Sequence, residues 1–467
     1  MKIPVTILLF VISAQVGQVE AFLASPLTTS VTATDTRPCR LLQPKASSRS
    51  NDLDTTTVGD LVVPSIGVGT ISWSSDNCTY FVFYSNGYSS QLLSEPRLSP
   101  VGISSYLAKK TTVFDFENKE LESLVQTACS SNGAFFDTAE RYGSNLKTSL
   151  GVGWGETESF LNKSLKQVPS DESSSQLRPV VATKFTPTPW RTTSQSVVDA
   201  CLQSRDRLGV EQIDLYQLHM PDIVQPLRFL GNDKPKDEIY WEGLAECYHR
   251  GLIKNVGVSN YGPTLVTRCQ EALAKHGVPL ASNQIAYNLI GRRNGAQETL
   301  DKCNELGIKV LAYYPFAMGL LTGKYSSKPG KAELSDQIVR SLITTKKTKL
   351  EEVDLRRYAH GDGSNIPPGG VSPLIAEMEN IAHTYDKTVA QVALNYIVCK
   401  GAIPIPGART AAQLKDNIGA MGWRLSSEEV DKLEDIADSL GFDFEGAGFK
   451  RTNEKFVGYG VEKWALN

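Results

Sequence analysis

The sequence predicts an α/β protein whose eight strands and intervening helices form a (β/α)8 TIM barrel. From Leu61 onward, short runs rich in β-branched and apolar residues alternate with stretches of helical periodicity. Several of these runs are continuously apolar, as in strands that are covered on both faces. Eight such runs favour a parallel sheet closed into a barrel, preceded by a disordered targeting presequence and carrying long insertions after strands 1 and 7.

The first 57 residues are expected to form the presequence and to take no part in the barrel. Residues 1–21 contain Lys2, the apolar run IPVTILLFVISA and a small-residue pattern ending at Ala21, which together predict a cleavable signal peptide. Residues 22–57 are rich in Ser and Thr and poor in acids, a composition typical of transit peptides. The combination resembles the bipartite presequence that directs proteins to plastids of secondary origin. A secreted protein with a Ser/Thr-rich linker is the alternative, and residues 58–467 form the barrel domain in either case.

Composition argues against several classes of partner. The 48 basic and 51 acidic residues give a formal charge of −3, which makes nucleic acid and anionic membranes poor partners. The N-terminal apolar run is too short for a stable membrane span. The eight cysteines are scattered, without a C-x-x-C pair or a histidine at ligand spacing. We therefore expect buried thiols in a reducing compartment and no metal site.

The elements of the barrel can be placed in order along the chain. Helical patterns cover residues 119–132, 193–209 and 389–401, and the last two end at a glycine, as many helices do. Residues 74–110 and 325–373 interrupt the alternation, and loops of this length are usually functional or disordered. The expected strands cover residues 66–71, 134–138, 179–185, 214–219, 253–259, 282–287, 308–314 and 402–407.

Polar and aromatic side chains collect where these strands end. In barrels of this kind the carboxyl ends of the strands open onto the face that carries the active site. Reactive groups are therefore expected to meet there. The residues at these ends are Trp73, Asp137, Lys184, His219, Ser259, Asn260, Gln284, Tyr313 and Gly407.

Lys184 is the most informative of these residues because it ends the apolar run VVATK. An unpaired ammonium group is costly to bury, so Lys184 needs an anion, and Asp137 on the preceding strand is the natural partner. A cation beside a phenol stabilises the phenolate, which would make a neighbouring Tyr142 a better acid. His219, on the next strand end, is suited to donate a hydrogen bond to a carbonyl oxygen. The simpler alternative is a helix cap at Asp137 and a packing role for Tyr142.

Seven segments in order, between residue 61 and about residue 440, resemble the aldo/keto reductase family. They are FDTAERYG, VVATKF, DLYQLHMPD, VGVSNY, NQIAYN, LAYYPFAMGLLTGKY and IPIPGARTAAQLKDNIGA. The resemblance implies reduction of an aldehyde or ketone to an alcohol, with hydride from a nicotinamide and a proton from Tyr142. Asp137, Lys184 and His219 complete the catalytic tetrad that it implies. A positioned proton donor and a polarising contact on one oxygen are what a carbonyl needs to become an alcohol.

The resemblance also implies a binding site for NADPH. Ser259, Asn260 and Gln284 match the residues that hydrogen-bond the nicotinamide carboxamide, and Tyr313 matches the aromatic side chain that stacks on the ring. Arg409 is suited to bind the ribose 2′-phosphate, which favours NADPH over NADH. Trp73 is expected in the substrate pocket. The remaining cofactor contacts are expected at Tyr314, Pro315, Phe316, Ala317 and Lys324 over the pyrophosphate, Gly407 at a phosphate, and Gln413 and Asn417 at the adenine and ribose.

The sequence departs from the family pattern in one wall of the site and leaves the function open in part. Tyr314 and Phe316 stand where Ser and Leu are common, so the wall beside the nicotinamide is bulkier than usual. A regulatory subunit that senses NADPH on the same fold is the alternative to a reductase. A reductase dedicated to one metabolite, such as pyridoxal, is a refinement of the first interpretation. The natural substrate and the oligomeric state stay open.

Overall fold

The structure is a computed structural model in which the described residues all belong to one compact unit, Ser50–Asn467. The expected signal peptide, most of the transit-like segment and the expected insertion over residues 74–110 lie outside the described residues. Of the expected insertion over residues 325–373, residues 369–373 are described. The described residues are 55–73, 118–131, 134–142, 154–168, 178–222, 235–293, 295–324 and 369–441.

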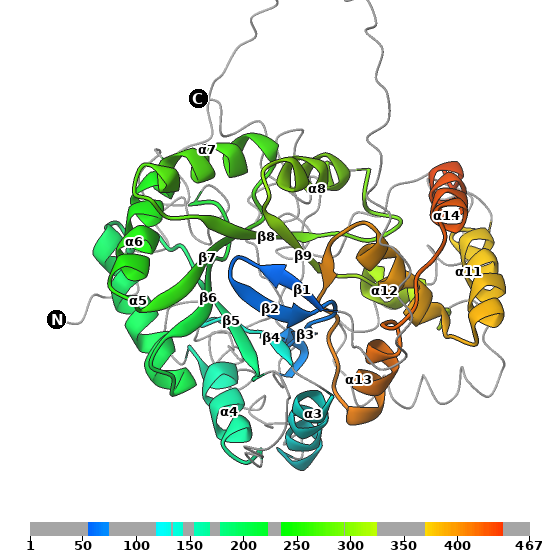
Figure 1. Cartoon of the computed structure of the whole chain (residues 1–467), viewed down its shortest axis with the longest axis horizontal. Coiled ribbons are helices and arrows are strands. Elements are labelled where there is room, and N and C mark those ends of the chain that lie inside the picture. The colour runs from blue at the N-terminus through cyan, green and yellow to red at the C-terminus, as the bar shows by residue number, and fades with distance from the viewer. Residues whose placement is uncertain are drawn as a thin grey trace, which may run out of the picture. The chain divides into compact units, whose positions relative to one another are not determined.

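Eight parallel strands curl into the barrel that the sequence predicts, and each lies within or close to its expected range (Figure 1). Strands neighbour one another in chain order, from β3 to β10. The first and last strands close the ring, since Gly67 N–H donates to Pro404 O at 2.9 Å and Gly69 pairs with Gly407. The strands are β3 (Val68–Gly69), β4 (Phe135–Asp137), β5 (Val180–Phe185), β6 (Ile213–Leu218), β7 (Ile253–Ser259), β8 (Leu280–Ala286), β9 (Lys309–Tyr313) and β10 (Ile403–Pro404).

Helices surround the strands and bury their outer faces in the main hydrophobic core. Two of the three helices predicted from periodicity are fixed by their ends: Thr193 caps α5 and Gly209 ends it in the left-handed region, while Thr388 forms a capping box at α12. Among the described residues, no helix has both the length and the hydropathy that crossing a membrane requires. The α-helices are α3 (Asn118–Ser130), α4 (Glu156–Leu165), α5 (Ser194–Leu208), α6 (Asp237–His249), α7 (Pro263–Ala274), α8 (Ala296–Glu305), α11 (Ser372–Tyr385), α12 (Val389–Cys399), α13 (Ala411–Ile418) and α14 (Ser427–Ser439), and the 3-10 helices are η2 (Ile71–Trp73) and η6 (Ala317–Thr322).

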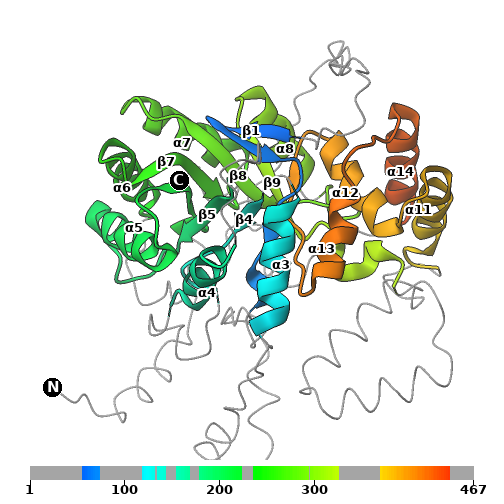
Figure 2. The same ribbon diagram turned by 60° about the horizontal axis from the view of Figure 1, so that its bottom comes forward.

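A hairpin of strands β1 (Thr55–Val58) and β2 (Leu61–Pro64) covers the end of the barrel where the strands begin (Figures 1 and 2). Val58 and Val63 are fully buried against inward-facing residues of the barrel. The sequence boundary expected between residues 57 and 58 therefore falls inside β1. Thr55, Thr56 and Thr57 share the composition of the preceding segment, and only their pairing with β2 makes them a strand.

Candidate active site

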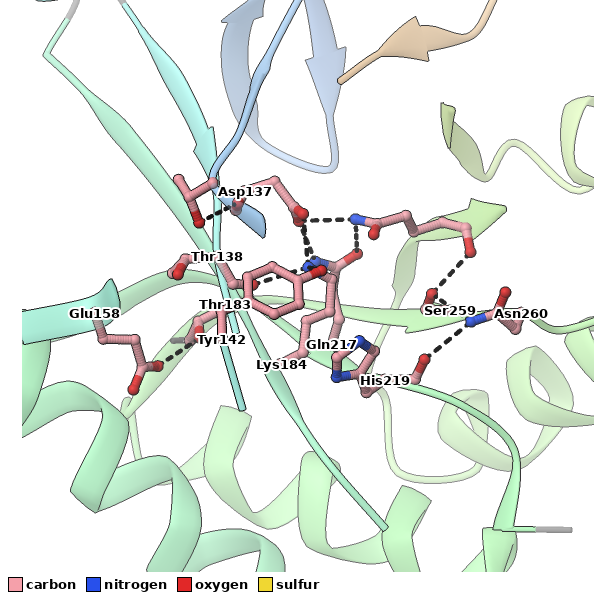
Figure 3. Close-up of polar contacts among 12 residues, drawn as sticks. Asp137, Thr138, Tyr142, Glu158, Thr183, Lys184, Gln217, His219, Ser259 and Asn260 are labelled. Carbon is pink, nitrogen blue, oxygen red and sulfur yellow. Dashed lines mark hydrogen bonds and ion pairs between the residues drawn. The ribbon is translucent and has the colours of Figure 1, made fainter. Parts of the chain in front are cut away.

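An ion pair between Lys184 and Asp137 lies at the carboxyl end of strands β4 and β5 (Figure 3). Lys184 Nζ is 2.6 Å from Asp137 Oδ2, donates to Thr138 O at 2.8 Å and lies 3.3 Å from Tyr142 Oη. Both charged side chains are buried. Burial lowers the pKa of Lys184, and Asp137 acts in the opposite direction. The carboxylate therefore compensates the ammonium group, as the sequence predicted.

Tyr142 is held over the ammonium group of Lys184 by a turn after β4. Its backbone N–H donates to Ala139 O at 3.0 Å, which brings the phenol back toward the strand end. Lys184 Nζ lies 4.8 Å from the centroid of the Tyr142 ring as well as near its oxygen. A cation in this place stabilises negative charge on the phenol oxygen when its proton leaves.

His219 follows strand β6 and packs edge-on against Tyr142. Its ring centroid lies 5.7 Å from that of Tyr142 with an interplanar angle of 78°, and its backbone N–H donates to Phe185 O at 2.8 Å. Burial lowers the pKa of His219 well below 6.5, and the positive charges of Lys184 and Arg141 lower it further. The imidazole is therefore neutral near pH 7, and one of its ring nitrogens carries a hydrogen.

Ser259 and Asn260 lie beside the tetrad (Figure 3), and Gln284 is hydrogen-bonded to it. Gln284 Nε2 donates to Asp137 Oδ1 at 2.7 Å, and Ser259 Oγ donates to Gln284 O at 2.9 Å. Asn260 Nδ2 donates to His219 O at 3.1 Å. All three side chains are buried, so the structure brings these predicted residues together with the tetrad.

The end of β9 and the loop that follows it place aromatic side chains next to these amides. Tyr313 is half-buried, and its hydroxyl donates to Asn260 Oδ1 at 2.6 Å. Tyr314, Ala317 and Met318 have positive φ values of 52°, 47° and 58°. Non-glycine residues adopt this conformation rarely, and such strain concentrates at functional sites. Of the other predicted residues in this loop, Pro315 is buried, Phe316 is half-buried and Lys324 is exposed.

The segment after β10 leads into the N-terminus of α13. Gly407 and Arg409 are exposed, and Thr410 caps the helix by accepting from Gln413 N–H at 3.1 Å. Gln413 Oε1 accepts from the backbone N–H of Arg409 at 2.8 Å, so this side chain stabilises the turn. Asn417 is buried one turn further along. The free backbone N–H groups of a helix start are suited to bind a phosphate.

Trp73, the last residue of η2, contacts the segment after β10. Its indole N–H donates to Ala408 O at 2.9 Å, and its ring packs against Phe136 on β4 and Phe160 on α4. The ring thus contributes to the packing between strand and helix, and its recorded contacts are not with the tetrad. It links η2 to the segment that carries Arg409.

Two residues whose side chains contact side chains of the tetrad, Gln217 and Thr186, were not predicted from the sequence. Gln217 lies opposite Lys184 in the sheet, and its Nε2 donates to Asp137 Oδ1 at 3.3 Å. Thr186 Oγ1 lies 3.3 Å from His219 Nδ1. The alternation of DLYQLH contains the signal for Gln217, because positions 217 and 219 face the same side of a strand. Nothing in the local sequence pattern marks Thr186.

A buried ion pair behind the tetrad fastens α4 to the strand that carries Lys184. Thr183 Oγ1 donates to Glu158 Oε1 at 2.5 Å, and Arg207 Nε is 2.6 Å from Glu158 Oε2. Burial raises the pKa of Glu158, and Arg207 opposes that change. The pair joins α4, β5 and α5 directly behind the site.

Comparisons with known proteins agree with this arrangement. The sequence profile of the Aldo/keto reductase family matches residues 108–438. Pyridoxal reductase, chloroplastic, of Arabidopsis thaliana is 32% identical over 341 residues, which cover 72% of this chain and 82% of that protein. Aldo-keto reductase str7 of Strobilurus tenacellus is 28% identical over 292 residues, 61% of this chain and 75% of its own length.

A solved structure shows the same fold. The crystal structure of Bombyx mori aldo-keto reductase AKR2E4 in complex with NADP aligns with a TM-score of 0.51 at 20% identity, over 83% of this chain and 93% of that chain. The eight-stranded barrel, the match of the family profile over most of the chain and the similarity to these relatives lead to one conclusion. The chain belongs to the aldo/keto reductase family of NAD(P)-dependent oxidoreductases.

Proposed function

We propose that the protein is an NADPH-dependent reductase that converts aldehydes or ketones to alcohols, with Tyr142 as the proton donor. The observation that carries this proposal is the contact between Tyr142 Oη and Lys184 Nζ, with Asp137 Oδ2 on the other side of the ammonium group. A packing role for Tyr142 would not require a buried charge beside its hydroxyl. A general acid does, because the charge stabilises the oxygen that gives up the proton.

The side chains around the tetrad fit a nicotinamide dinucleotide. A hydroxyl and two primary amides at Ser259, Asn260 and Gln284 supply donors and acceptors for a carboxamide, and half-buried Tyr313 supplies an aromatic ring beside them. The start of α13 supplies backbone N–H groups for a phosphate. Exposed Arg409 supplies a guanidinium that suits a 2′-phosphate, which supports NADPH as the cofactor.

Each residue of the tetrad has one task in the proposed reaction. The bound cofactor supplies a hydride to the carbonyl carbon. Tyr142 donates its proton to the oxygen, and Lys184 stabilises the charge that remains on the phenol. Asp137 holds Lys184 in place, and the neutral imidazole of His219 donates a hydrogen bond to the carbonyl oxygen.

Oxidation of NADPH by the protein starting at Thr55, measured over many turnovers with a panel of aldehydes, tests this proposal. Pyridoxal belongs in the panel because a 32% identical relative is named pyridoxal reductase. Sustained turnover supports the reductase, and a marked preference for pyridoxal would identify the substrate. Tight NADPH binding with one turnover at most would point instead to a regulatory protein that senses NADPH.

We also propose that the N-terminal presequence directs the protein to a plastid. The support is the succession of an apolar signal and a Ser/Thr-rich, acid-poor stretch, together with the chloroplastic relative. A fluorescent protein fused behind residues 1–54 is expected to enter the plastid of an alga with secondary plastids. Secretion of the fusion would contradict the proposal.

A further inference from the structure

Thr186, the first residue after β5, contacts the imidazole of His219. Its Oγ1 lies 3.3 Å from His219 Nδ1, and both residues are buried. The backbone of His219 is fixed beside it, since His219 N–H donates to Phe185 O. The contact therefore joins two residues whose main chains are held in place by the same pair of strands.

The ion pair between Arg191 and the buried carboxylate of Glu140 fixes the position of Thr186. Its N–H donates to Glu140 Oε1 at 2.6 Å, and its carbonyl accepts from Arg191 Nη1 at 3.0 Å. Arg191 also binds both carboxylate oxygens of Glu140, at 2.5 and 3.1 Å. The guanidinium lies 4.7 Å from the ring centroids of Phe185 and Trp154. The hydroxyl of Thr186 is thus presented to His219 by a rigid support.

Because the imidazole of His219 is neutral, the position of its one N–H hydrogen decides which ring nitrogen can donate a hydrogen bond. The charged groups that act on the ring are Lys184 from β5 and Arg141 from the segment after β4, and both are cations. The phenol of Tyr142 packs against the ring, and the uncharged amide of Asn260, the residue after β7, donates to the backbone carbonyl of His219. A neutral imidazole donates from one nitrogen and accepts at the other.

The Thr186 hydroxyl is available as the donor in this contact. Among the described residues, Nδ1 of His219 is the one recorded hydrogen-bond partner of Thr186 Oγ1, so its hydrogen is not needed elsewhere. When the hydroxyl donates to Nδ1, the ring hydrogen lies on Nε2. Within the same residues Nε2 has no recorded partner, which leaves its N–H for a ligand.

We propose that Thr186 is a positioning residue that selects the tautomer of His219 with hydrogen on Nε2. Its effect on turnover rests on the proposed reductase function, because that N–H is the donor to the carbonyl oxygen. The effect of Thr186 on the tautomer is independent of that function. Without the hydroxyl, molecules with hydrogen on Nδ1 become populated, and these lack the donor.

Nitrogen NMR of histidine-labelled protein without substrate reads the tautomer directly. The chain has five histidines, and His219→Gln identifies the signals of His219. Wild type and Thr186→Ser are expected to carry hydrogen on Nε2, and Thr186→Val is expected to show a mixture. Thr188→Val is the matched control, because Thr188 Oγ1 is buried without a hydrogen-bond partner in the described part of the chain. Thr186→Ala offers a second variant without the hydroxyl if Thr186→Val does not fold.

Kinetics supply the second measurement. Loss of one hydrogen bond predicts roughly a fivefold to tenfold lower kcat for Thr186→Val, with an unchanged KM for NADPH and recovery in Thr186→Ser. Hydrogen on Nδ1 in the wild type, or an unchanged tautomer in Thr186→Val and Thr186→Ala, would overturn the proposal. A third outcome separates the two proposals. If the wild type carries hydrogen on Nε2 and Thr186→Val loses it, but the wild type turns over no aldehyde, the role of Thr186 is supported and the reductase function is contradicted.

Discussion

Asp137 and Gln284 lie 147 positions apart in the chain and are joined by a hydrogen bond of 2.7 Å from Gln284 Nε2 to Asp137 Oδ1. The other carboxylate oxygen of Asp137 accepts from Lys184. One carboxylate thus connects the group that supports the proton donor with an amide expected to bind the nicotinamide. In the proposed reaction, proton transfer and cofactor binding would therefore depend on the same carboxylate.

Replacement of Tyr142 by Phe is expected to lower kcat by roughly two to four orders of magnitude, because it removes the positioned proton donor. Binding of NADPH, measured by fluorescence titration, is expected to be retained. Tyr216→Phe is the matched control, since the Tyr216 hydroxyl is buried without a hydrogen-bond partner in the described structure. Loss of cofactor binding together with turnover in Tyr142→Phe would show a structural role.

Removal of the Lys184 ammonium group is expected to destabilise the protein as well as inactivate it. In Lys184→Met the carboxylate of Asp137 stays buried without its cation, which costs about 3–5 kcal/mol of unfolding free energy. Lys184→Met combined with Asp137→Asn is expected to recover part of that stability and none of the activity. Urea denaturation measures the stability of the single and the double variant, and NADPH oxidation measures their activity. Lys302→Met, which breaks an exposed pair with Glu305, is the control and is expected to cost less than about 1 kcal/mol. A similar cost at both lysines would contradict the prediction.

Replacement of Arg409 by Ala is expected to weaken NADPH binding about tenfold to a hundredfold, because a charge-assisted contact to the 2′-phosphate is lost. NADH lacks this phosphate, so its dissociation constant should change little. Calorimetric titration of both cofactors makes the comparison. Lys415→Ala, which removes an exposed positive charge further along α13, is the control. Equal weakening of NADPH and NADH would remove the argument for cofactor preference.

Asp237 is expected to make stability depend on pH. Burial raises the pKa of its carboxyl from 3.8 to about 6, while the hydrogen bond from Tyr261 opposes this and the charge of Asp222 adds to it. The folded state therefore keeps a proton that the unfolded chain releases, and this group reduces the unfolding free energy as pH rises from about 4 to about 6. Over this pH range the contribution of Asp237 to the unfolding free energy falls by about 3 kcal/mol.

Urea denaturation of wild type and Asp237→Asn at several pH values checks that expectation. The variant should lose this part of the pH dependence, while other titrating groups, His219 among them, act equally in both proteins. Asp435→Asn changes an exposed carboxylate on α14 and should leave the dependence as it is in the wild type. Parallel stability curves for wild type and Asp237→Asn would contradict the assignment.

The sequence predicts the barrel well because short stretches of neighbouring residues identify its strands and helices. Buried strands such as β5 are apolar except for Thr183 and the site residue Lys184, and helices such as α5 begin after a capping threonine and end at glycine. It predicts the pairing of Lys184 with Asp137 because a buried charge demands a counter-ion. Features that depend on partners elsewhere in the chain could not be predicted in this way. They include the strand conformation of Thr55–Val58, which comes from pairing with β2, and the contact of Thr186 with His219. The packing of Trp73 against Phe136 and Phe160 also depends on partners that local sequence does not encode.

The hairpin at the amino-terminal end of the barrel limits where the chain can be cut. Val58 and Val63 fill the mouth of the inner core, and a side chain at Gly59 would collide with Asn255, so the turn between them has one permitted shape. For the proposed presequence, we therefore expect proteolytic removal to occur before Thr55. Cleavage after Val58 would remove β1 and with it part of the cover over the inner core, so the fold limits how far into the chain the proposed leader can extend.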